Sequence, residues 1–96
     1  MIQSYVVVAY KDNGEKTYKN YSTLKTAVTA TRYIAKSKVY SEVSLFIAYY
    51  QSERKVKQCS PNKIKTLWRS VDCDIEDLNK LNQNDCEEAM SDGNLR

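Results

Sequence analysis

The sequence predicts an α+β fold in which a small antiparallel sheet (ββαββ) packs on one helix, followed by one or two C-terminal helices. Three observations lead to this fold class. Two strand-length runs are apolar on both faces, an Asn-Gly turn follows the first run, and one amphipathic stretch lies between the two runs. A length of 96 residues fits one compact unit. We expect residues 1–71 to form a basic α+β core domain and residues 72–96 an acidic C-terminal helix with a frayed tail.

The first run, residues 3–11 (QSYVVVAYK), is rich in β-branched and aromatic residues on both faces. This pattern is typical of a central strand that is covered on at least one side. Asp12, Asn13 and Gly14 follow it, and Asn-Gly tolerates the positive φ angles of a tight turn. Residues 15–20 are therefore predicted to form the returning strand of a hairpin.

A helix is predicted next, with Ser22 as its N-cap and its end near Lys38. Its apolar residues recur at helical spacing along one stripe. The stripe consists of Leu24, Ala27, Val28, Thr31, Ile34 and Ala35. A second, solvent-facing ridge carries Lys25, Arg32 and Lys36 at matching positions.

The second hairpin is predicted over residues 43–59. Residues 43–50 (VSLFIAYY) are largely apolar on both faces and indicate a second interior strand. Residues 51–54 are polar and turn-like, and residues 55–59 (KVKQC) would return as an edge strand. Lys55 and Lys57 share its outward face, where charges discourage unwanted pairing.

The C-terminal third is predicted to be helical. Ser60 and Pro61 are typical of a helix start, and Ile64, Leu67, Trp68 and Val71 follow at i, i+3, i+4 and i+7. Alternation of Ile64, Thr66 and Trp68 leaves a strand open as the alternative. Asp72 or Asp74 would cap a last helix with Ile75, Leu78 and Leu81 on its apolar side. From Asn82 onward we expect the chain to fray, in an end that the core does not need.

Charge is divided unevenly along the chain. Residues 1–70 contain 13 basic and 4 acidic residues, a net charge of +9, whereas residues 71–96 contain 2 basic and 8 acidic residues, a net charge of −6. This asymmetry indicates electrostatic partners rather than chemistry. The acidic end has three interpretations: a solvated helix and tail, a segment that folds back over the basic surface, or a negative patch for a basic protein.

Catalytic chemistry has little support. The chain has no histidine, no Cys-x-x-Cys pair, no calcium loop and no glycine-rich phosphate motif. Cys59, near Lys57 and Lys63, is the one alternative as an activated thiol. We therefore expect a non-enzymatic protein without catalytic residues, cofactors, metal ligands or a small-molecule substrate.

The cellular compartment is expected to be the cytoplasm. No apolar run reaches the roughly 18–20 residues that span a bilayer, so we expect no membrane partner. No secretory signal is visible at the N-terminus, and three cysteines are an odd number, which favours reduced thiols.

Nucleic-acid binding is better supported, because Lys and Arg hold phosphates and aromatic faces stack on unpaired bases. Trp68 is assigned to the core rather than to such a stacking role, on its helical spacing. The candidate contact residues are basic side chains of the helix ridge and of residues 55–69, with two tyrosines beside them. They are Lys25, Arg32, Lys36, Tyr49, Tyr50, Lys55, Lys57, Lys63, Lys65 and Arg69.

Three segments give the chain a family resemblance: the strand SYVVVAYK, the helix STLKTAVTATRYIAKSK and the hairpin VSLFIAYYQSERKVKQC. Over about the first 60 residues this layout resembles small phage-encoded anti-CRISPR proteins that inhibit type I effector complexes. The resemblance implies a phage or mobile-element protein that inhibits or modulates a host nucleoprotein complex by occupying its surface. The alternative is a direct, non-specific binder of RNA or single-stranded DNA with an autoinhibitory acidic end.

Overall fold

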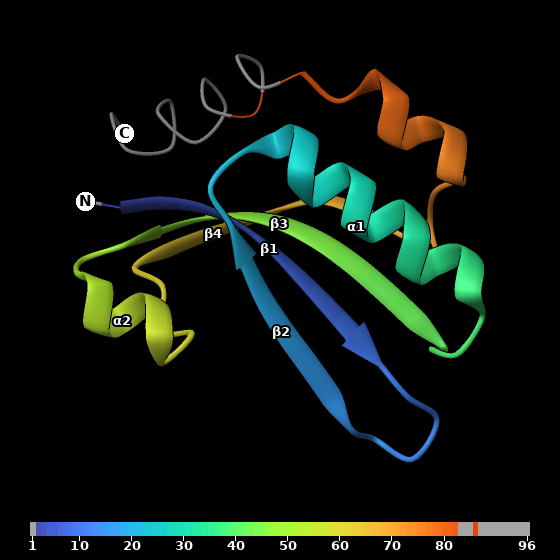
Figure 1. The fold of residues 1–96 in the computed structure, drawn as a ribbon, viewed down its shortest axis with the longest axis horizontal. Coiled ribbons are helices and arrows are strands. Elements are labelled where there is room, and N and C mark those ends of the chain that lie inside the picture. Colours follow the sequence, from blue (N-terminus) through green and yellow to red (C-terminus); the bar gives the residue numbers. More distant parts are fainter. Residues whose placement is uncertain (1, 83–85, 87–96) are drawn as a thin grey trace.

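A computed structural model of the chain describes residues 2–82 and residue 86. Its elements are four strands, two α-helices and one 3-10 helix (Figure 1). In chain order they are β1 (Ile2–Tyr10), β2 (Lys16–Tyr21), α1 (Leu24–Ser37), β3 (Glu42–Tyr50), α2 (Glu53–Lys57), β4 (Lys63–Arg69) and the 3-10 helix η1 (Ile75–Lys80).

The four strands form one antiparallel sheet in the order β2-β1-β3-β4. Its centre is the pair β1–β3, which is in register from Ile2 opposite Tyr50 to Tyr10 opposite Glu42. Figure 1 shows α1 and η1 on one side of this sheet and α2 on the other. The predicted α+β fold class is therefore confirmed.

Local sequence signals predict the elements in the first half of the fold to within a residue or two. The β1–β2 turn closes through a hydrogen bond from the Lys11 N–H to the Glu15 carbonyl (2.9 Å), and Gly14 adopts a φ of 90°. That backbone conformation favours glycine because it has no Cβ. The cap of α1 is Thr23 rather than the predicted Ser22: the Thr23 hydroxyl accepts from the Thr26 N–H.

The predicted strand over residues 55–59 and the first prediction for residues 60–71, a helix, were wrong, whereas the alternative of a strand within residues 60–71 is confirmed. Residues 53–57 form the short helix α2 instead of a turn and a returning strand, because Ser52 caps it and accepts from the Lys55 N–H. The fourth strand is Lys63–Arg69, where the sequence predicted a helix. Pairing with the otherwise open edge of β3 satisfies many backbone groups at once, and this outweighs local helical spacing.

Strand β4 follows the alternation of Ile64, Thr66 and Trp68, the pattern that indicated a strand as the alternative to a helix. Trp68 lies opposite Leu45 and is buried, which confirms its assignment to the core. The register shifts between Leu45 and Phe46, so that Leu67 is an extra residue in β4. Such a bulge lets both Leu67 and Trp68 pack against the core below α1.

The main core lies between the sheet and α1. Tyr5 and Val7 of β1 and Leu45 and Ile47 of β3 point into it, and Ala27 of α1 packs against them. These side chains are almost completely buried. Burial of this kind stabilises by roughly 25 cal/mol per Å² of apolar surface removed from water.

Part of the acidic segment belongs to this core. Leu78 of η1 is only 1% exposed, and the Trp68 Nε1–H donates to the Asp74 carbonyl at 2.8 Å. At the start of η1 the Asp77 carboxylate accepts from the Asp74 N–H at 3.0 Å. This bond and Lys80 hold the pKa of Asp77 below its ordinary value. The core therefore does use residues 74–80. Cys86, in the end that was predicted to fray and to be dispensable for the core, is also buried in this core, so the prediction is wrong at this residue. Residues 83–85 and 87–96 lie outside the described residues.

Leu78→Ala tests whether η1 is part of the folded body. We expect the free energy of unfolding to fall by about 2–5 kcal/mol, because the substitution leaves a cavity in the main core. Urea denaturation measures this change. Val71→Ala removes an exposed apolar side chain just before η1 and should change stability by less than about 0.5 kcal/mol. Equal stability of the two variants would contradict the packing of η1.

Candidate functional site

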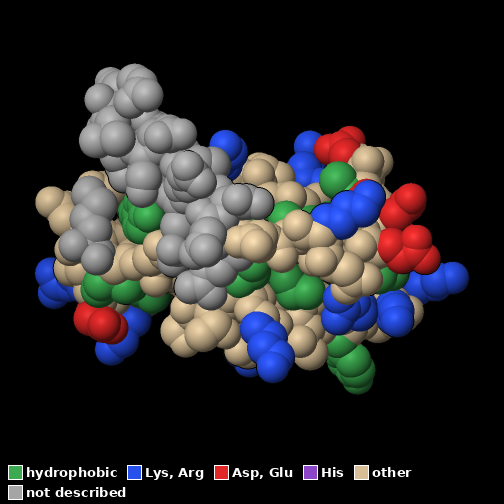
Figure 2. Space-filling view, turned by 90° about the horizontal axis from the view of Figure 1, so that it is seen from above, with side chains coloured by type: hydrophobic (Ala, Val, Ile, Leu, Met, Phe, Trp, Pro, Cys, Tyr) green, Lys and Arg blue, Asp and Glu red, His purple; other side chains and the backbone are tan. Residues whose placement is uncertain are grey.

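The ten candidate contact residues lie on four separate elements. Three are on α1 (Lys25, Arg32, Lys36), two at the end of β3 (Tyr49, Tyr50), two on α2 (Lys55, Lys57) and three on β4 (Lys63, Lys65, Arg69). On the side carrying α1 and η1, Lys and Arg side chains are spread over the surface and several acidic side chains gather at one end (Figure 2). The structure therefore does not unite the ten residues in one patch.

The cations of α1 form the most regular of these groups. Lys25, Arg32 and Lys36 are separated by seven and four residues, so they align on one ridge of the helix, roughly 16 Å long. Lys25 and Arg32 also line a groove of about 430 Å³ between α1 and η1. The Arg32 guanidinium donates to the side-chain carbonyl of Asn79, which ties the ridge to η1.

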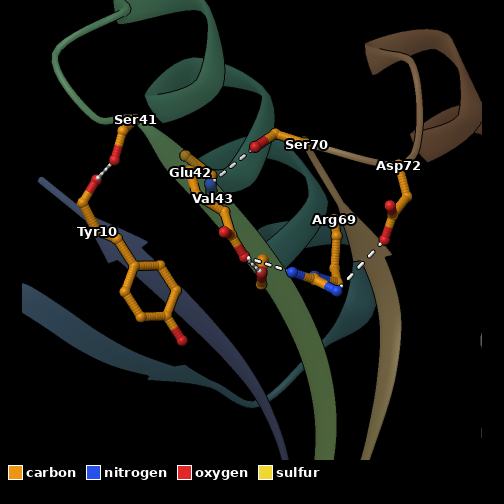
Figure 3. Close-up of polar contacts among 8 residues, drawn as sticks. Tyr10, Ser41, Glu42, Val43, Arg69, Ser70 and Asp72 are labelled. Atoms are coloured by element: carbon orange, nitrogen blue, oxygen red, sulfur yellow. Dashed lines mark hydrogen bonds and ion pairs between the residues drawn. The ribbon is translucent and has the colours of Figure 1, made fainter. Parts of the chain in front are cut away.

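Arg69 is bound within the protein. Its guanidinium lies 3.1 Å from the Glu42 carboxylate and 3.4 Å from the Asp72 carboxylate (Figure 3). The hydrogen bond to Glu42 and the charges of both acids raise the pKa of Arg69. Its charge is therefore largely compensated, and it is a weaker contact candidate than the lysines.

The two tyrosines of β3 point to opposite faces of the sheet. Tyr49 packs against the core below α1, and Tyr50 is buried on the other face. The Tyr50 hydroxyl donates to the Asn20 side-chain oxygen at 3.0 Å. Burial and the nearby Cys59 raise the pKa of Tyr50, against the lowering effect of this hydrogen bond. Tyr50 is thus a structural residue that offers no surface to a ligand.

The remaining lysines differ in exposure. Lys57 and Lys65 are exposed, whereas Lys55 and Lys63 are half-buried. In the described part of the chain none of these four lysines forms an ion pair, and the same holds for Lys25 and Lys36. Uncompensated positive charge is therefore a property of α1, α2 and the edge strand β4.

The ten candidate contact residues do not include a group of residues on the sheet face opposite α1. Tyr10, Tyr18, Phe46 and Ile64 share this face by strand register, and Tyr18 and Ile64 are about half exposed. The alternation within each strand already assigns residues to two faces. The alternation does not show which of the two faces α1 covers.

Among residues 2–82 and residue 86 there is no group of three or more Cys, Asp or Glu side chains that could hold a metal ion. Cys59, Cys73 and Cys86 are free thiols. Within the same residues no helix has the length and apolar character needed to cross a bilayer. Comparison with protein-family models, with curated proteins and with solved structures finds no match.

The raised pKa of Tyr50 predicts a loss of stability in alkali. Above pH 10 the unfolded chain releases the phenolic proton while the folded chain retains it, so stability falls as pH rises toward the folded pKa. The loss is at most about 1.4 kcal/mol per pH unit for this one group. We expect Tyr50→Phe to show a shallower decline in urea denaturation above pH 10.

Tyr33→Phe is the matched control, because Tyr33 is 77% exposed on α1. Its removal should leave the alkaline decline of the parent protein unchanged. Identical slopes for Tyr50→Phe and Tyr33→Phe would contradict the assignment to Tyr50.

Proposed function

We propose that this chain is a small non-enzymatic binding protein that attaches to a nucleic-acid-handling complex of its host and inhibits or modulates it. The cationic ridge of α1, formed by Lys25, Arg32 and Lys36, is the proposed centre of contact. The observation that carries the proposal is uncompensated positive charge on a rigid helix in a chain without a histidine.

Two physical arguments favour this ridge over the other cationic groups. Exposed lysines that lack an internal partner accelerate association with an anionic surface and select against cationic ones. A helix also fixes their spacing. Thr29 lies between Lys25 and Arg32 on the same ridge, so the ridge is polar throughout.

The family resemblance indicates the class of target. Of the three segments that carry it, the first strand and the helix have the expected form, whereas α2 replaces the second strand of the expected hairpin over residues 43–59. The resemblance is to anti-CRISPR proteins of type I effector complexes, which occupy a subunit interface or a DNA groove. In this proposal the protein comes from a phage or mobile element, acts in the cytoplasm and antagonises a defence complex without turnover.

Affinity capture from a host lysate tests this function, with and without nuclease. We expect the tagged full-length chain to retain a complex that contains nucleic-acid-binding subunits after nuclease treatment. Lys25→Glu combined with Lys36→Glu should weaken its binding by about tenfold or more, because it places like charges against the partner.

Lys19→Glu combined with Lys38→Glu changes net charge equally outside the ridge and serves as the control. It should retain most of the binding. Loss of the complex on nuclease treatment, or equal loss with both double variants, would contradict a protein contact through α1.

A second candidate function is direct binding of RNA or single-stranded DNA, restrained by the acidic segment. The observation that favours it is the placement of η1 beside α1, where Arg32 donates to Asn79. Glu76 of η1 is exposed, and it lines a hollow together with Ala35 of α1. A polyanion that approaches α1 therefore competes with η1.

Glu76→Gln tests this restraint without removing Leu78 from the core, as truncation would. We expect the affinity of the full chain for a single-stranded oligonucleotide at low salt to rise about two- to fivefold, the effect of one exposed charge. Fluorescence anisotropy measures it. Asp12→Asn makes the same charge change in the β1–β2 turn, and an equal rise there would contradict a specific role of η1.

A further inference from the structure

We propose that the sheet face opposite α1 is a base-stacking site for single-stranded nucleic acid, with Tyr18, Phe46 and Tyr10 as its platform. The inference rests on direct nucleic-acid binding, the activity of the second candidate function, but places the bound strand on the side of the sheet away from the α1 ridge and from η1, where the acidic segment does not restrain it. The chemistry recognised is a polyanionic backbone with unpaired aromatic bases.

In the described part of the chain, this face has a buried apolar layer that is covered mainly by side chains of the sheet itself. Val6 and Val8 of β1 and Ala48 and Tyr50 of β3 form its buried layer. From outside the sheet, Val56 of α2 is the one apolar side chain that the described part of the chain packs against this layer. Helix α2 lies at the end of the sheet where β3 finishes (Figure 1), and no other described element outside the sheet packs an apolar side chain against this layer.

Large apolar side chains lie on this open part. Tyr18 is 50% exposed and Ile64 52% exposed, and the rings of Tyr10 and Phe46 are half-buried. Tyr18 lies opposite Val8 and Tyr10 opposite Lys16, so the two tyrosines are diagonal neighbours with Cβ atoms roughly 7–8 Å apart. Phe46 lies on β3, two strand spacings from Tyr18, on the order of 10 Å. The three rings can therefore each receive a different base.

The charge of the face suits a polyanion. Register places three charged side chains of the strands on this face, Lys16, Glu42 and Arg69, and Arg69 occupies the Glu42 carboxylate at 3.1 Å. Lys16 is exposed, with its Nζ 5.9 Å from the centre of the Tyr10 ring. A phosphate near Lys16 would place its base over the Tyr10–Tyr18 pair. At the other end, Lys55 and Lys57 flank Val56 on α2.

The same charges argue against a second copy of this chain as the occupant. Two copies joined face to face would bring Lys16 and the cations of α2 close to positive charges of the other copy. Residues 1–70 of each copy carry a net charge of +9. Like charges at an interface cost several kcal/mol. A nucleic-acid strand instead gains from counterion release and from base stacking.

The test is fluorescence anisotropy of a labelled oligothymidylate with the full chain at low salt. We expect Tyr18→Ala to weaken binding about 5- to 150-fold, as for the loss of one stacked base. Tyr18→Phe should bind as the parent does, because it keeps the ring. Phe46→Leu removes a ring but keeps an apolar side chain of similar size, and it should weaken binding in the same range.

Tyr33→Ala is the matched control on α1, where the ring is 77% exposed on the other side of the molecule. It should leave the affinity unchanged, and circular dichroism confirms that each variant is folded. Binding that Tyr18→Ala and Phe46→Leu do not weaken overturns the site but leaves nucleic-acid binding in place. No binding at low salt, equal affinity for a duplex, or a dimer that Tyr18→Ala disrupts overturns the proposal as well.

Discussion

The antiparallel pair β1–β3 is the constraint on which the rest of the structure depends. Its nine residue pairs run from Ile2–Tyr50 to Tyr10–Glu42, and both strands are apolar on both faces. Such a pair needs a strand at each edge and cover on each face, since unpaired backbone groups and exposed apolar side chains are both costly. β2 and β4 supply the edges and α1 covers one face. Among the described residues, the other face receives one apolar side chain from outside the sheet, Val56 of α2, and its partly exposed aromatic residues follow from this shortage of cover.

The sequence predicts the fold well where the signal is local. β1, the turn at Gly14, β2, α1 and β3 each carry their own pattern of alternation, turn residues or helical spacing. Residues 53–69 were mispredicted because two patterns compete there. Ser52 starts a helix in a stretch that alternates weakly, and residues 64–71 fit a helix as well as a strand. The edge of β3 decides the second case, since β4 pairs with it and places Trp68 opposite Leu45. The sequence of residues 60–71 alone does not show that β3 offers an edge for pairing.

The candidate site is predictable in part for a related reason. Basic residues are visible in the sequence, and Lys25 and Lys36 do lie exposed on one ridge of α1. Whether a cation is compensated depends on partners distant in sequence, as for Arg69 with Glu42. The role of Phe46 was hidden in the same way. Alternation assigns it to the face of Tyr50, but only the placement of α1 decides that this face stays open.

The fold shows on which side of the sheet the acidic residues of the sequence lie. Leu78 in the core and the bond from Trp68 to the Asp74 carbonyl fix η1 beside α1, so its carboxylates lie on the helix side of the sheet. The negative charge of η1 therefore shares that side with the lysines of α1, although Lys25 and Lys36 form no ion pair in the described part of the chain. On the opposite side the only strand carboxylate, Glu42, is already bound to Arg69, and Lys16 is free of acidic partners in the described residues. A single-stranded polyanion therefore meets less internal competition at the open sheet face than at α1. The two proposed contacts thus lie on opposite sides of one sheet, and a bound strand would not block a protein partner on α1.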